Sequence, residues 1–127
     1  MPANPIRWFE IYVQEMPRAR KFYESVFGVT LSQIKTPPSS SGMELWGFPS
    51  NQESYGASGA LVKMPGMNPC GGGTIVYFAS DDCAIEEKKI AKSGGKIERP
   101  KFAIGEYGFI TLAVDTEGNI IGVHSMK

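Results

Sequence analysis

His124 is the only histidine in this chain of 127 residues. An imidazole changes its charge near neutral pH, so it can act as a general acid or a general base. The other interpretation is structural: the side chain forms a hydrogen bond that orders the C-terminal part of the chain. Both interpretations stay open, and His124 is our first candidate catalytic residue.

A single carboxylate, Glu10, lies within a run of aromatic and aliphatic residues, WFEIYV at 8–13. An ionised carboxylate in apolar surroundings is unfavourable unless it has a partner. Carboxylates in such places are enriched at functional sites, which makes Glu10 the second candidate catalytic residue. The alternative is a carboxylate at a strand end that reaches water or pairs with Arg7 or another base.

Three aromatic residues, Trp8, Tyr12 and Tyr77, could stack on a flat ligand or could belong to the ordinary core. The two cysteines, Cys70 and Cys83, show no spacing typical of a disulfide framework or a zinc site, so we expect two free thiols. The glycines that follow Cys70 resemble a phosphate loop only superficially, because no Lys-Ser/Thr pair follows them.

The overall charge is balanced, with 13 Lys and Arg against 13 Asp and Glu. We therefore expect no nucleic-acid partner and no membrane partner. No apolar run approaches 18 residues and no signal peptide is visible, which favours a cytoplasmic protein. The expected partners are a small-molecule ligand and a second copy of the chain.

Alternation and helical spacing predict the elements that position these residues. The first half is expected to contain a strand at 6–13, a helix from Pro17 to Gly28, and strands at 29–35, 43–48 and 57–63. Ala19, Phe22, Tyr23 and Val26 are expected on one helical face. Loops are expected at 37–41 and 49–56, and a Gly- and Pro-rich linker at 65–73. The second half is expected to contain a strand at 74–79, a helix capped by Asp82 that ends near 93, and strands at 96–99, 107–114 and 119–124, with a turn at 115–118.

The order of elements is therefore βαβββ, linker, βαβββ, which predicts an α+β fold of two modules. We expect one domain over 1–127, with module one at 5–64, the linker at 65–73 and module two at 74–127. Each module has a four-stranded, curved mixed sheet with a helix on one face. The other face needs a cover, which a second module can supply.

Three segments resemble the vicinal oxygen chelate superfamily, the family of glyoxalases, bleomycin resistance proteins and extradiol dioxygenases. The run FEIYVQEMPRARKFYESVFGV at 9–29 is similar to the opening of such proteins. GGGTIVYFASDDCAIEEKKIAKSGGKI at 71–97 is similar to the start of their second module, and DTEGNIIGVHS at 115–125 to their closing turn and strand. The resemblance covers essentially the whole chain and implies paired βαβββ modules around a cavity, often in a homodimer.

Members of this family that use a metal hold it with four side chains, typically His, Glu or Gln. The corresponding positions here are Trp8, Ile75, Gly122 and one position within 58–62, where no His, Glu or Asp occurs. These side chains do not coordinate a divalent cation. We therefore expect no metal and no cofactor.

The resemblance also implies which side chains line the cavity. Residues two apart on a strand share a face, so Glu10 follows Trp8 and His124 follows Gly122 on the ligand side. The expected site has Glu10 and His124 as catalytic residues and is lined by Trp8, Tyr12, Ile75, Tyr77 and Gly122.

Three functions stay open for this site: a metal-independent enzyme of the lyase or isomerase type, a protein that binds or sequesters a small molecule without chemistry, and a metal-dependent lyase or dioxygenase with a displaced site.

Overall fold

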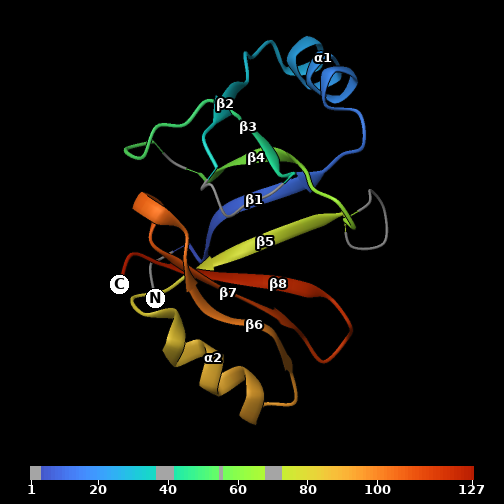
Figure 1. The fold of residues 1–127 in the computed structure, drawn as a ribbon. Helices are drawn as coiled ribbons and strands as arrows, with labels where there is room; N and C mark the ends of the chain where they lie inside the picture. Colours follow the sequence, from blue (N-terminus) through green and yellow to red (C-terminus); the bar gives the residue numbers. More distant parts are fainter. Residues whose placement is uncertain (1–3, 37–41, 55, 68–72) are drawn as a thin grey trace. The chain divides into compact units, whose positions relative to one another are not determined.

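The computed structural model describes residues 4–36, 42–54, 56–67 and 73–127 (Figure 1). In these residues it contains β1 (Ile6–Tyr12), α1 (Met16–Phe27), β2 (Ser32–Ile34), β3 (Glu44–Gly47), β4 (Ser58–Lys63), β5 (Thr74–Ala79), α2 (Cys83–Lys92), β6 (Lys96–Ala103), the 3₁₀ helix η1 (Gly105–Tyr107), β7 (Phe109–Val114) and β8 (Ile120–Ser125). The order βαβββ occurs twice, which confirms the predicted α+β fold. The chain forms two compact units: Trp8–Thr74, and Ile75–Lys127 with the described residues before Trp8.

The unit Trp8–Thr74 has strands in the order β2-β3-β4-β1. The pairs β2–β3 and β3–β4 are antiparallel, whereas β1 and β4 are parallel. Helix α1 packs on one face through a core of Val13, Met16, Leu31 and Leu61, with Ile11 packed beside them. The opposite face is the helix-free face of this unit.

The predicted end of α1 is confirmed. Gly28 has a φ of 66°, which a residue without a Cβ adopts at little cost, and its N–H donates to the Glu24 carbonyl at 3.0 Å.

The predicted apolar face of α1 is right only in part. Ala19 and Tyr23 pack on the core, but the side chains of Phe22 and Val26 are 57% and 56% exposed. Met16, Ala19 and Tyr23 contact the core, whereas Phe22, which is about 100° around the helix axis from Tyr23, lies in solvent. Val26 belongs to the last turn of the helix. The helical spacing predicted the helix correctly but did not predict which of its apolar residues pack on the sheet.

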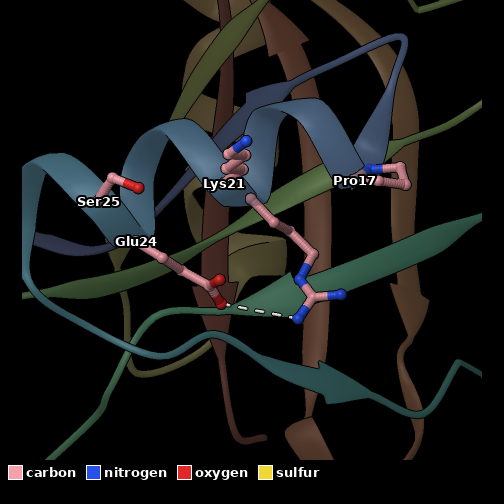
Figure 2. A pocket seen from close by; sticks show the side chains of 5 residues that line it. Pro17, Lys21, Glu24 and Ser25 are labelled. Atoms are coloured by element: carbon pink, nitrogen blue, oxygen red, sulfur yellow. Dashed lines mark ion pairs between the residues drawn. The ribbon is translucent and has the colours of Figure 1, made fainter.

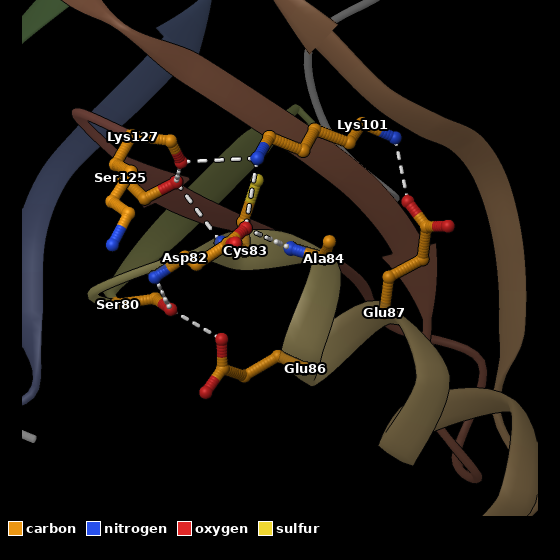
Figure 3. Close-up of polar contacts among 9 residues, drawn as sticks. All are labelled: Ser80, Asp82, Cys83, Ala84, Glu86, Glu87, Lys101, Ser125 and Lys127. Atoms are coloured by element: carbon orange, nitrogen blue, oxygen red, sulfur yellow. Dashed lines mark hydrogen bonds and ion pairs between the residues drawn. The ribbon is translucent and has the colours of Figure 1, made fainter.

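The second unit has strands in the order β5-β8-β7-β6, with β5 and β8 parallel and the other two pairs antiparallel. Helix α2 covers one face of this sheet. Its predicted cap is confirmed, because the Asp82 carboxylate accepts a hydrogen bond from the Ala84 N–H at 3.0 Å. The Ser125 hydroxyl accepts one from the Cys83 N–H at 3.0 Å, which places Ser125 on the helix side (Figure 3).

Strand β6 is longer than the predicted strand at 96–99 and passes through Pro100. It ends the strand order of its unit, so a residue without an N–H is tolerated there. Two shifts in the register with β7, on either side of Arg99, accommodate the proline. The predicted strand at 107–114 is shorter, because residues 105–107 form η1.

The predicted turn at 115–118 is confirmed. Gly118 has a φ of 85°, and the Asp115 N–H donates to the Asn119 carbonyl at 2.8 Å. The predicted loop at 37–41 and most of the predicted linker, with Cys70, lie outside the described residues. The thiol of Cys83 is free and buried. Among the described residues, no helix has the length and hydropathy needed to cross a membrane.

Candidate functional site

Trp8, Glu10 and Tyr12 share the helix-free face of the first unit. Their neighbours Ile11 and Val13 pack with α1, and side chains alternate along a strand. The Tyr12 hydroxyl donates to Glu10 Oε1 at 2.7 Å. Tyr12 is 6% exposed, while Trp8 and Glu10 are half-buried. Strand β1 thus presents a carboxylate that is oriented by a buried phenol.

Tyr77 and Gly122 lie side by side on β5 and β8 of the second unit. The Tyr77 ring covers the Cα of Gly122 so closely that a Cβ at residue 122 would overlap it. Because Ser125 faces α2, alternation places Gly122 and His124 on the helix-free face, with Tyr77 and Ile75. Ile75 and Tyr77 are buried, at 1% and 4% exposure.

The imidazole of His124 has one well-defined partner. Its Nε2 lies 2.6 Å from the main-chain carbonyl oxygen of Tyr107, at the end of η1. Its Nδ1 is buried and has no hydrogen-bond partner among the described residues. Nothing in the sequence indicated Tyr107, because the contact is made by its main chain and carries no residue-type signal.

The structure therefore brings together Glu10 with Tyr12, and Tyr77 with Gly122. Glu10 and His124 belong to different compact units, so their predicted pairing stays a prediction.

The positions that correspond to metal ligands do not fit a metal. Gly122 has no donor, and the space of a side chain there is filled by the Tyr77 ring. Ile75 and Trp8 offer no suitable donor either. On the helix-free face of β4, the residues opposite Trp8, Glu10 and Tyr12 are Ser58, Ala60 and Val62. Among the described residues, no group of three or more His, Cys, Asp or Glu could hold a metal ion.

A shallow surface hollow of about 380 Å³ lies along α1 (Figure 2). Its lining residues are Pro17, Arg20, Lys21, Glu24 and Ser25. The Arg20 guanidinium stacks 3.6 Å above the Trp46 ring and lies 3.6 Å from the Glu24 carboxylate. Glu24 also accepts a hydrogen bond from the Leu31 N–H at 2.9 Å. None of the predicted site residues lines this hollow, and two of its polar groups, Arg20 and Glu24, are engaged by Trp46 and the Leu31 N–H.

A polar network surrounds the start of α2 (Figure 3). The Lys101 ammonium donates to the Asp82 carboxylate at 2.8 Å and to the Lys127 carbonyl at 3.0 Å. The hydrogen bond from Lys101, helped by that from the Ala84 N–H, lowers the pKa of Asp82 below its ordinary value. The Ser80 hydroxyl donates to Glu86. These groups satisfy one another's hydrogen-bonding capacity at the start of α2, so we infer that the network stabilises the fold.

The model of the Glyoxalase/Bleomycin resistance protein/Dioxygenase superfamily matches residues 6–123. The putative glyoxylase CFP32 of Mycobacterium tuberculosis (strain CDC 1551 / Oshkosh) is 26% identical over 130 residues. The match covers 91% of this chain and 43% of that protein. The protein of the same name in Mycobacterium bovis matches equally well. The chain thus spans somewhat under half the length of these curated relatives.

Solved structures share the fold over almost the whole chain. A methylmalonyl-CoA epimerase of Streptomyces coelicolor, in complex with 2-nitronate-propionyl-CoA, superposes with a TM-score of 0.69 at 16% identity, over 96% of this chain and 94% of that one. The hypothetical protein BH1468 of Bacillus halodurans C-125 gives 0.74 at 12% identity, over 98% and 96%. The epimerase of Mycobacterium tuberculosis gives 0.67 at 13% identity, over 97% and 88%. At such low sequence identity, these matches show a shared fold and nothing further.

Proposed function

Because the chain belongs to the glyoxalase, bleomycin resistance protein and dioxygenase superfamily, we propose that it binds a small molecule and converts it by metal-independent acid–base chemistry of the lyase or isomerase type. The helix-free faces of its sheets carry the binding residues in this proposal. Glu10 and His124 are the proposed acid–base residues, and Trp8, Tyr12, Ile75, Tyr77 and Gly122 line the faces. The superfamily hosts many chemistries, so the argument depends on these side chains.

One observation carries the proposal: the hydrogen bond of 2.7 Å from the Tyr12 hydroxyl to Glu10 Oε1. The buried phenol limits the rotation of the carboxylate and holds it on the face that also presents the Trp8 ring. A fixed carboxylate beside a flat aromatic surface is suited to removing a proton from a bound substrate. Orientation of this kind lowers the entropic cost of reaching the reactive geometry.

The proposal is tested by a ligand screen that follows the melting temperature, with methylmalonyl-CoA and a set of flat aromatic acids as probes. For compounds that bind, turnover is followed by the loss of substrate C–H signals in D₂O. Glu10→Gln is expected to abolish turnover at unchanged or slightly higher stability. Glu53→Gln, an exposed carboxylate in the β3–β4 loop, is the matched control and should leave both properties unchanged.

The alternative is a protein that sequesters its ligand without chemistry. Binding without exchange in D₂O, equal in wild type and Glu10→Gln, would favour that function. A loss of stability in both Glu10→Gln and His124→Gln, with ligand-induced shifts unchanged, would leave both residues as structural and would contradict the proposal.

We propose, further, that the protein is a homodimer, as the family resemblance implies, and that it is cytoplasmic. The free, buried thiol of Cys83 is compatible with a reducing compartment. Light scattering at tens of micromolar protein tests the dimer, and a monomeric mass at that concentration would contradict it.

A further inference from the structure

The turn between β6 and β7 reaches the C-terminal end of β8. It consists of η1 with Ile104 before it and Gly108 after it. The Ile104 N–H donates to the Gly108 carbonyl at 2.8 Å, which closes the turn on itself.

This turn delivers one main-chain carbonyl, that of Tyr107, to His124 Nε2 at 2.6 Å. A carbonyl oxygen only accepts hydrogen bonds, so Nε2 must carry the proton. In the neutral ring, Nδ1 then keeps a lone pair and acts as an acceptor. The residues beside His124 in the sheet, Ala79 on β5 and Ile110 on β7, have no side-chain donor to offer it.

We infer that the β6–β7 turn is a positioning device that fixes the tautomer of His124, with the proton on Nε2 and the lone pair on Nδ1. This inference rests on the proposed function, in which His124 is an acid–base residue, and it names the groups that position the ring. Tyr107 acts through its main chain, and the residue that places it is Gly108.

Alanine substitutions at two glycines of the turn distinguish a displacement of the turn from backbone strain alone. Gly108 has a φ of 100°, and a Cβ there would overlap the Ser125 carbonyl oxygen and lie 3.0 Å from the Cα of Met126. Gly105 has a φ of 72°, but a Cβ there would meet nothing within 4 Å. An alanine at either site strains the backbone, whereas only Gly108→Ala also pushes the turn away from β8.

The test uses the fact that His124 is the only histidine, so ¹⁵N–¹H correlation spectra of the imidazole contain a single ring. In the wild type at a pH where the ring is neutral, we expect Nε2 to be fully protonated and Nδ1 to be unprotonated. Gly108→Ala should shift the ring toward the tautomer mixture of the urea-unfolded protein. Gly105→Ala should keep the wild-type pattern, and so should Tyr107→Ala, which retains the carbonyl.

A wild-type ring with the proton on Nδ1, or with the mixture of the unfolded protein, would overturn the inference even if Gly108→Ala fails to fold. So would an unchanged tautomer in folded Gly108→Ala. These spectra are recorded without a ligand, so their outcome does not depend on whether the proposed function is correct.

Discussion

At the scale of single residues, the clearest feature is the contact between Tyr77 and Gly122. A glycine in a strand interior has an entropic cost and often marks a close approach by another group. Here the other group is an aromatic ring, which occupies the space of the missing side chain. The contact accounts for a glycine at residue 122, although no positive φ requires one there.

Gly122→Ala is expected to destabilise the protein by about 1–3 kcal/mol, the usual cost of overpacking a well-packed site. Tyr77→Leu removes the ring, and in that background the added methyl group should cost much less. Urea unfolding of the two single variants and the double variant measures this coupling. Additive losses would show that the Tyr77 ring is not the reason for the glycine.

The faces of the site residues were predictable from the sequence, but their partners were not. Strict alternation placed Trp8, Glu10 and Tyr12 together, because the period of a strand is two. The contact of His124 with the Tyr107 carbonyl was not predictable. It depends on η1, where alternation predicted the start of a strand, and a main-chain acceptor is the same for every residue type.

At the scale of elements, the start of α2 shows how a helix end is held. Asp82 caps the helix and also accepts the hydrogen bond from Lys101 on β6. The capping role was readable from the sequence, because Asp is a preferred N-cap residue. The partner 19 residues later was not, since it depends on where β6 passes the helix.

Because Lys101 and the Ala84 N–H lower the pKa of Asp82, its carboxylate stabilises the fold at pH values above the ordinary pKa of 3.8. This contribution is lost as the pH falls through the still lower pKa of the folded state. Asp82→Asn should therefore lower the unfolding midpoint at pH 7, and the difference from wild type should shrink on acidification below about pH 4.

The matched control for this prediction is Asp81→Asn, which removes the same charge from an exposed side chain one residue earlier. Its effect should be small at every pH. Urea midpoints measured from pH 7 to pH 3 distinguish the two variants. A difference between Asp82→Asn and wild type that grows toward low pH would contradict the assigned role.

Helix α1 is held to its sheet in part by Arg20, whose guanidinium stacks on Trp46. The Trp46 indole N–H in turn donates to Glu44 at 2.8 Å. Arg20→Ala is expected to cost about 0.5–1 kcal/mol, because it removes the cation–π contact and the cover of the ring. Arg18→Ala, at an exposed position two residues earlier, is the control. Equal urea midpoints for the two variants would mean that the stacking contributes nothing measurable.

At the scale of the whole molecule, the repeated order of elements was the feature of the sequence that predicted the fold. Two βαβββ runs, each with a helix stop and a glycine after it, were visible without any identity between the halves. The main errors were in the residues of α1 that pack on the core and in the length of β6. Both depend on tertiary packing: α1 contacts the core through Met16, Ala19 and Tyr23, and β6 continues past Pro100 because it pairs with β7 on one side.

The last prediction concerns metal binding and follows from the side chains at the positions that correspond to the family's metal ligands. Protein purified without chelators should contain far less than one Zn, Ni, Mn or Fe ion per chain by elemental analysis. EDTA should leave ligand-induced melting shifts unchanged. The reason is that the positions that correspond to metal ligands hold Trp8, Ile75 and Gly122, and that a side chain at residue 122 would overlap the Tyr77 ring. Gly122→His alone should therefore not create a site. One bound ion per chain in the wild type, or in Gly122→His with Tyr77 intact, would contradict this account of the closed position.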